Sequence, residues 1–117
     1  MKLNSWKESM TLAEEIYRIV RGFPKEELFA LSSQIKRAAI SIPSNIAEGS
    51  GRQTKKDSIR FFHIARGSLY ELETLVTLGK MVGFIHENQF SAIELRIKNN
   101  QKLLNGLIRY YENASLE

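Results

Sequence analysis

The chain has 117 residues, 43% of them hydrophobic, with seven glycines and two prolines, and this suits one mainly helical domain spanning residues 1–117. It has no cysteine, which excludes disulfides, thiolate zinc sites and cysteine nucleophiles. The formal charge of +4 is compatible with nucleic acid or an acidic partner, and equally with an ordinary solvated surface. No apolar run approaches the ~18 residues of a membrane span and the N-terminus lacks a signal-peptide core, so we expect a cytoplasmic protein with no membrane contact.

Apolar residues recur at steps of three and four in four segments, which predicts four helices. The first runs from about residue 5 to 21, capped by Asn4 or Ser5 and ended by Gly22-Phe23-Pro24. Its predicted inner face is Trp6, Met10, Ala13, Ile16, Tyr17 and Val20.

The second predicted helix covers residues 25–48, and Pro43 is expected to interrupt it by removing a backbone hydrogen bond. Its core face is Leu28, Leu31, Ile35, Ala39, Ile42 and Ile46. A second apolar set, Phe29, Ile40 and Ala47, falls about 100° around the helix. This helix should therefore have a second neighbour, either another helix or another subunit.

The third predicted helix covers residues 54–81, with Thr54 as its cap and Asp57 in the capping-box position. Its inner face is Phe62, Ala65, Leu69, Leu72 and Val76. Gly67 and Gly79 inside it predict close approach of a neighbouring helix, since each costs about 1 kcal/mol relative to Ala.

The fourth predicted helix covers residues 87–111, and no strand pattern is visible. Its inward positions are Phe90, Ile93, Ile97, Leu104, Leu107, Ile108 and Tyr111. Four helices joined by short loops predict an all-α, antiparallel up-down-up-down four-helix bundle.

Catalysis is not expected. The two histidines, His63 and His86, have no Glu three or four residues before them, so the di-metal bundle pattern is absent, and no Ser-His-Asp arrangement is recognisable. We therefore expect no catalytic residue, metal or cofactor. The glycine-rich loop Gly49-Ser50-Gly51-Arg52 is compatible with phosphate binding at a helix N-terminus, or simply with a C-cap glycine before a new helix.

Basic residues give the best candidate for a functional surface. Arg52, Lys55, Lys56 and Arg60 crowd the start of the third helix, and Lys36 and Arg37 add two charges in the second. We predict contacts between these side chains and nucleic-acid phosphates, largely independent of sequence. No aromatic residue is interleaved among them, so base stacking is not expected. The alternative is a solvated charged face.

A polar stripe borders the core face of the second helix and comprises Gln34, Ser41, Asn45 and Glu48, beside Pro43. Arg66 and Glu73 flank the core face of the third helix. We predict a hydrogen-bonded network between the two helices, with Glu48 meeting Arg66. A functional pocket is the alternative for this region.

Several stretches match a known family. They are Phe23-Pro24-Lys25-Glu26-Glu27, then Leu31 to Ala39, then Ser41-Ile42-Pro43-Ser44-Asn45-Ile46-Ala47-Glu48-Gly49, and finally Phe61 to Leu72. The chain resembles, from Trp6 to about Tyr111, the four-helix-bundle proteins encoded in intervening sequences of bacterial 23S rRNA genes. Their relatives include the accessory protein of diversity-generating retroelements.

The resemblance implies a bundle that assembles into a ring-like homopentamer. In the retroelement relatives, a basic ring associates with nucleic acid and a reverse transcriptase. DNA or RNA, and a nucleic-acid enzyme, are therefore the partners that it suggests. We expect a non-enzymatic oligomeric scaffold that binds nucleic acid. The alternative is a protein-interaction module with no nucleic-acid role, in which the apolar flank of the second helix binds another protein.

Overall fold

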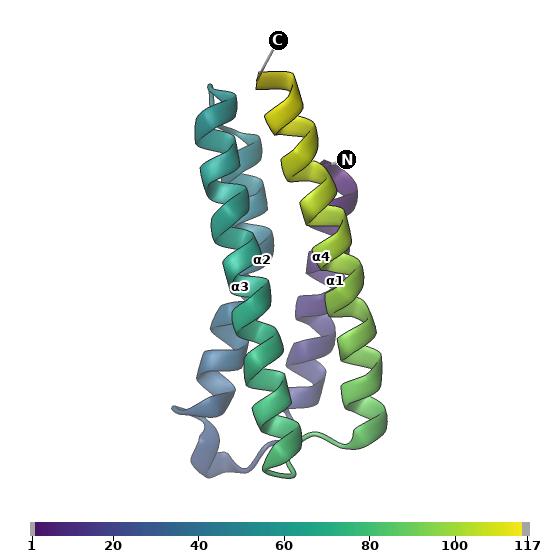
Figure 1. The fold of residues 1–117 in the computed structure, drawn as a ribbon. Helices are drawn as coiled ribbons and strands as arrows, with labels where there is room; N and C mark the ends of the chain where they lie inside the picture. Colours follow the sequence, from purple (N-terminus) through teal and green to yellow (C-terminus); the bar gives the residue numbers. More distant parts are fainter. Residues whose placement is uncertain (1, 116–117) are drawn as a thin grey trace.

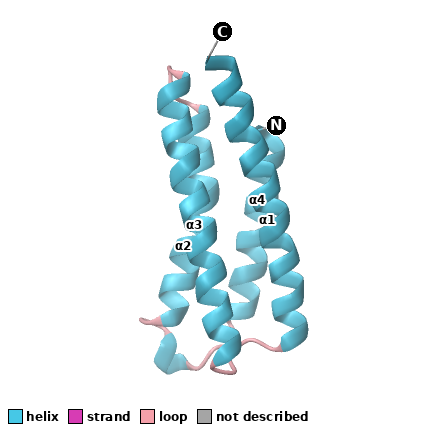
Figure 2. Ribbon diagram, viewed as in Figure 1, coloured by secondary structure: helices cyan, strands magenta, loops and turns pink. Residues whose placement is uncertain are grey.

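The computed structural model describes residues 2–115, and all its regular structure in that range is helical (Figure 2). Four α-helices follow one another: α1 (Lys2–Val20), α2 (Leu31–Ser50), α3 (Lys55–Met81) and α4 (Glu87–Ser115). A short 3₁₀ helix, η1 (Lys25–Glu27), precedes α2. None of these helices combines the length and the apolar content needed to cross a membrane.

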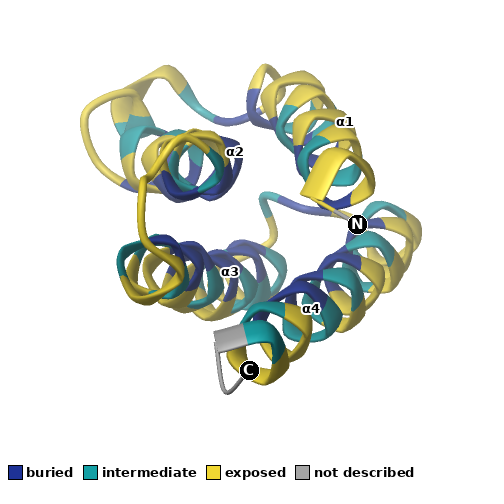
Figure 3. Ribbon diagram, turned by 90° about the horizontal axis from the view of Figure 1, so that it is seen from above, coloured by how far each residue is buried: buried dark blue, intermediate teal, exposed yellow. Residues whose placement is uncertain are grey.

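The helices form a four-helix bundle. Viewed from one end, they occupy the corners of a square in the order α1, α2, α3, α4, and each packs against the two beside it (Figure 3). The α2–α3 connection lies at one end, close to the start of α1 and the end of α4 (Figure 1). The α1–α2 and α3–α4 connections lie at the other end (Figure 1). We call these the α2–α3 end and the double-connection end.

Apolar residues of all four helices fill the core. The inner face predicted for α3 is confirmed, because all five of its residues are fully buried. The face predicted for α4 is confirmed through Ile108, with Phe90 and Tyr111 partly buried at its ends. Burial of each fully buried valine, leucine, isoleucine or phenylalanine side chain of these faces stabilises the fold by about 1.5–3 kcal/mol.

The face predicted for the first helix is wrong in part. Residues that point into the core are Ser5, Ser9, Leu12, Ile16 and Val20. Met10 and Tyr17 are instead exposed, at 46% and 37%, and Trp6 and Ala13 are only partly buried. These four side chains face α2 rather than the bundle axis, because α1 is rotated so that its small serines approach the core. Its start at Lys2 also places Ser5 inside the helix rather than at its cap.

The second helix starts later than predicted, at Leu31 rather than at residue 25. The signals that predicted its start, Pro24 followed by Glu26 and Glu27, produce the single turn of η1 instead. The chain then breaks at Ala30, whose φ and ψ are −121° and −108°. As a result Leu28, predicted in the core, is 51% exposed.

The interruption expected at Pro43 is not found, because α2 continues through it to Ser50. Pro43 is buried within the helix. Gly49 is also inside α2, and a Cβ there would lie 2.7 Å from Cε1 of Phe62 and 2.9 Å from the carbonyl oxygen of Ser58. Gly49 therefore lets α3 approach α2 closely, which corrects its interpretation as a C-cap.

Candidate nucleic-acid interface

Four basic side chains gather at the α2–α3 end, as predicted from their positions in the sequence. The connection places Arg52 just after α2, and Lys55, Lys56 and Arg60 in the first two turns of α3. Thr54 fixes where α3 begins, because its Oγ1 accepts a hydrogen bond of 3.1 Å from the backbone N–H of Asp57. The predicted cap is thus confirmed. The basic residues in the first two turns of α3 are exposed.

Asp57 organises the two arginines of this group. Arg60 reaches Oδ1 of Asp57 through two nitrogens, at 3.1 and 3.0 Å. Nε of Arg52 lies 3.7 Å from Oδ2 of Asp57, and its terminal nitrogen pairs with Glu48 at 2.8 Å. Arg52 and Arg60 are therefore partly neutralised by carboxylates.

Lys55 and Lys56 differ from the arginines, since both are exposed and form no ion pair within residues 2–115. Their charges are available to a phosphate without breaking an existing pair. Anions are also favoured at this helix end, where backbone N–H groups and the helix dipole add positive potential.

Aromatic rings lie among these charges, contrary to expectation. The guanidinium carbons of Arg52 and Arg60 each lie 4.4 Å from the ring centroid of Phe61. Nζ of Lys55 lies 5.8 Å from the ring of Tyr111, a residue of α4. Tyr111 was not predicted here because it is remote in the chain, whereas Phe61 directly follows Arg60 and its position was a usable signal.

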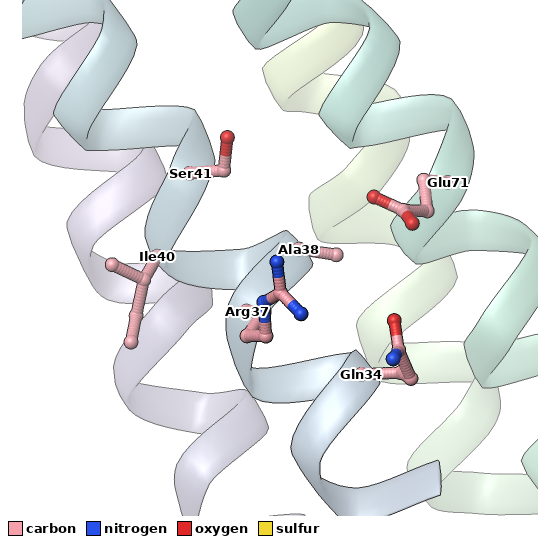
Figure 4. A pocket seen from close by; sticks show the side chains of 6 residues that line it. All are labelled: Gln34, Arg37, Ala38, Ile40, Ser41 and Glu71. Atoms are coloured by element: carbon pink, nitrogen blue, oxygen red, sulfur yellow. The ribbon is translucent and has the colours of Figure 1, made fainter. Parts of the chain in front are cut away.

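Lys36 and Arg37 do not join this group. In the direction of the α2 axis they lie roughly 22–24 Å from Arg52, which follows the end of the helix, and they face different sides of α2. Nζ of Lys36 is 5.5 Å from the ring of Tyr17 on α1. Arg37 borders a hollow of about 360 Å³ between α2 and α3, with Gln34 beside it and Glu71 across from it (Figure 4). The six predicted contact residues thus divide into one cluster of four and two separate positions.

The polar stripe of α2 makes one link to α3. The side-chain amide of Asn45 donates to the carbonyl oxygen and to Oγ of Ser41, at 2.8 and 3.0 Å. Oγ of Ser68 on α3 donates to Oγ of Ser41 at 2.8 Å. Through Ser41 these bonds form the observed α2–α3 polar contact, whereas Gln34 is exposed at the hollow of Figure 4.

The predicted Glu48–Arg66 pair is wrong. Glu48 pairs with Arg52. Arg66 faces α4, where it donates to the side-chain oxygen of Asn105 at 3.1 Å, and it also donates to Nδ1 of His63 at 2.8 Å. A guanidinium has no acceptor, so Nδ1 of His63 is the acceptor in this contact.

Glu73, also expected to meet α2, belongs to a charged cluster between α3 and α4. It pairs with Lys98 at 3.0 Å and accepts from Gln101 at 3.4 Å. A hydrogen bond from Glu94, together with Lys98, lowers the pKa of Glu73. Burial and the neighbouring Glu73 raise the pKa of Glu94. The pKa values of the two carboxyl groups are therefore shifted in opposite directions from their ordinary value.

Neither histidine has a metal-binding neighbourhood. His86 precedes α4, where its backbone N–H donates to the side chain of Gln89 at 2.9 Å. Within residues 2–115, no group of three or more His, Asp and Glu side chains is arranged to hold a metal ion.

The fold defines the class of this protein, an all-α four-helix bundle. The chain belongs to the 23S rRNA-intervening sequence protein family, whose model matches residues 1–106. It is also similar to a crystal structure of a protein of unknown function from the S23 ribosomal protein family of Bacteroides thetaiotaomicron. The TM-score is 0.85 and the identity 29%, over 93% of this chain and 99% of that one. No curated protein matches this chain.

Proposed function

We propose that this protein is a non-enzymatic, oligomeric scaffold that binds nucleic-acid backbones through its α2–α3 end. The observation that carries the proposal is the cluster of Arg52, Lys55, Lys56 and Arg60 around the start of α3, with two lysines that have no carboxylate partner in the described chain. Phosphate contacts of this kind release counterions, so they bind strongly at low salt and carry little sequence information.

A second copy of the chain is the proposed occupant of an apolar groove between α1 and α2. A hollow of about 420 Å³ there is lined by Trp6, Met10, Ala13, Tyr17, Ile40, Pro43, Ser44 and Ala47. Elsewhere, Gly67 on α3 is exposed and has open space where a Cβ would stand, so no helix of the same chain accounts for it. The groove between α1 and α2 and the open surface at Gly67 are separate, which suits the head-to-tail contacts of a closed ring. The resemblance suggests five copies.

Binding is tested by fluorescence anisotropy of a labelled oligonucleotide across a salt series. The double variant Lys55→Glu/Lys56→Glu should weaken binding at least about tenfold at low salt, and it should reduce the slope of log affinity against log salt by about 1.8, or about 0.9 for each phosphate that is no longer neutralised. The control is Arg21→Glu/Lys25→Glu, two exposed positions in the α1–α2 connection with the same change in net charge. An equal effect in both double variants would contradict a localised interface.

Assembly is tested by light scattering of the purified protein. The proposal expects an oligomer at micromolar concentration, and Met10→Glu in the groove should dissociate it, because a charge buried between subunits without a partner is unfavourable. A wild-type monomer would overturn the scaffold.

The second candidate is a protein-interaction module with no nucleic-acid role, favoured by the apolar character of the same groove. It predicts no oligonucleotide binding even at low salt, and a groove that binds one defined partner protein. The anisotropy measurement separates the two functions directly.

A further inference from the structure

A second hollow lies next to the basic cluster, at the α2–α3 end of the bundle, and is lined by residues of α1, α3 and α4. Its volume is about 420 Å³ and its lining residues are Lys2, Lys55, Leu107, Tyr110 and Tyr111. None of these described lining residues is acidic, and neither lysine forms an ion pair within residues 2–115. The hollow thus combines two cations with two aromatic rings, whose roles can be separated.

Tyr111 is held in the structure. Its ring packs edge-on against the buried Phe62, with ring centroids 4.9 Å apart and planes at 83°. Nζ of Lys55 lies 5.8 Å from its centroid. Tyr111 therefore has a structural role in the core and positions one cation beside the hollow.

Tyr110 is not held in this way. It is 58% exposed, and the ring contact that it makes is with Tyr111, at 6.0 Å and 69°. The contacts of Tyr110 within residues 2–115 therefore reveal no stabilising role for its ring in the monomer, and the ring is exposed beside two lysines that form no ion pair in that range. Such rings are the platforms on which unpaired bases stack, while adjacent lysines contact the backbone phosphates.

An adjoining hollow of about 370 Å³ shares Lys2 with the first. It is lined by Lys2, Leu3, Trp6, Ala47 and Ser50, and is more apolar. Trp6 also lines the groove proposed above for a second copy, so the aromatic platform at this end is Tyr110. Lys2 lies at the border of both hollows, where a strand bound at Tyr110 would reach the second one.

We infer that the Tyr110 hollow is a binding site for an unpaired nucleotide of single-stranded DNA or RNA, with the base on Tyr110 and the neighbouring phosphates at Lys2 and Lys55. This inference rests on the proposed nucleic-acid function and adds a preference to it. Bases of a duplex are stacked on each other and cannot reach a ring, so a duplex uses only the cations of this end. Single strands use the cations and the ring.

The test compares a single-stranded 20-mer of DNA, the same sequence in RNA, and the corresponding DNA duplex, at equal phosphate concentration and fixed salt. The wild-type protein should bind both single strands more tightly than the duplex. Tyr110→Ala should weaken single-strand binding at least about fivefold and leave duplex binding unchanged. Tyr110→Phe keeps the ring and should retain binding. Tyr70→Ala removes a similarly exposed tyrosine of α3, 50% accessible, and should change neither.

Trp6 supplies an independent signal, because it is the single tryptophan of the chain. Its emission should change when a single strand occupies the adjoining hollow, and Tyr110→Ala should shift the midpoint of that titration by the same factor. Circular dichroism of each variant establishes that the fold is kept, which is expected since Tyr110 is mostly exposed.

The outcomes are distinguishable. Equal loss of binding in the Tyr110→Ala and Tyr70→Ala variants, or equal affinity of the wild type for single strands and duplex, would overturn this site while leaving the basic scaffold standing. Absence of binding to all three probes at low salt would overturn the proposed function, and this site with it. A preference for only one of the two single strands supports the site and identifies the sugar that it accepts.

Discussion

The two ends of the bundle are closed in a similar way but present different surfaces. At each end a glycine near the end of a helix admits a large side chain: Gly49 of α2 faces Phe62, and Gly79 of α3 faces Ile85. A Cβ at these positions would lie 2.7 Å from the ring of Phe62 and 2.8 Å from Cδ1 of Ile85. Packing at each end therefore requires a residue without a side chain at this position.

The connections themselves differ. At the double-connection end, the turn after α3 contains Gly83, with φ of 87°, and then directs Phe84 and Ile85 inward, where Phe84 packs on Phe23 at 5.4 Å. At the α2–α3 end, residues 51–54 are all exposed, and α2 and α3 already close the core beneath them. The turn after α3 contributes side chains to the core, whereas residues 51–54 do not. The α2–α3 connection and the start of α3 can therefore carry exposed charged residues.

The largest effect on stability is expected when the buried Ile85, in the turn after α3, is truncated. Ile85→Ala should lower the free energy of unfolding by about 2–5 kcal/mol, because Ile85 is only 3% exposed and its removal leaves a cavity. Gln53→Ala in the other connection should change it by less than about 0.5 kcal/mol, since Gln53 is exposed. Urea unfolding followed by circular dichroism measures both. A cost below about 1 kcal/mol for Ile85→Ala would show that the turn does not belong to the core.

Glycine packing is tested by pairing a crowded glycine with an open one. Gly49→Ala introduces a methyl group against the Phe62 ring and the Ser58 carbonyl, and the strain of about 1–3 kcal/mol should exceed the ~1 kcal/mol gained in helix propensity. Gly67→Ala meets no atom within 4 Å in the chain and should gain that ~1 kcal/mol.

Thermal denaturation in dilute solution separates these two variants, with the oligomeric state of each measured alongside. A stabilised Gly49→Ala variant would show that the α2–α3 contact is loose. If Gly67→Ala instead dissociates an oligomer, the open space above Gly67 belongs to a subunit contact.

The sequence predicted the α3 and α4 faces correctly because in each helix one set of apolar residues repeats at helical spacing and is buried, whereas other apolar residues such as Ile64, Leu78 and Leu95 fall off that spacing and are exposed. It failed for α1 because Trp6, Met10 and Tyr17 are apolar yet line a groove, and helical spacing does not distinguish a core from a flank. The break before α2 has no signal at all, since no residue from Leu28 to Ala30 is a helix breaker. Its exposed Leu28 and Phe29 could not be told from core residues.

The candidate interface was predictable only where it is local in sequence. Arg52, Lys55, Lys56 and Arg60 are neighbours in the chain and remain neighbours in space. Lys36 and Arg37 were predicted as contact residues from their charge alone. Successive residues of a helix point about 100° apart, so these two side chains lie on different sides of α2. The Tyr110 hollow joins residues from three helices, including both ends of the chain, so it required the packed bundle.

The helix starts at the two ends offer a smaller contrast. Thr54→Ala removes the side chain that accepts from the backbone of Asp57 and should cost about 1 kcal/mol. Gln89→Ala removes the acceptor of the His86 backbone N–H at the double-connection end, and should cost less because that N–H is exposed to water. Thr54→Ser, which keeps the hydroxyl, is the control. Equal losses for Thr54→Ala and Thr54→Ser would assign the effect to the methyl group rather than to the cap.

The smallest expected effects come from the carboxyl pair between the two ends, and they should depend on pH in opposite ways. The pKa of Glu73 is lowered below 4.5, so its ion pair stabilises the folded state above that pH and is lost as pH falls. The pKa of Glu94 is raised, so its contribution is present at low pH and is lost as pH rises through the folded-state pKa. At pH 7, Glu73→Gln should therefore destabilise the protein, and Glu94→Gln should stabilise it, each on the order of 0.5 kcal/mol.

The amide of a glutamine at position 94 can donate to Glu73 at every pH, whereas Glu94 donates only when it is protonated. The gain in Glu94→Gln should consequently disappear near pH 4, where the wild type also carries the proton. Urea unfolding of the wild type and both variants at pH 4 and pH 7 measures this. If Glu94→Gln destabilises the bundle at pH 7, the two carboxyl groups do not repel, and the Glu73–Lys98–Glu94 cluster instead binds α3 to α4 through both of its charges.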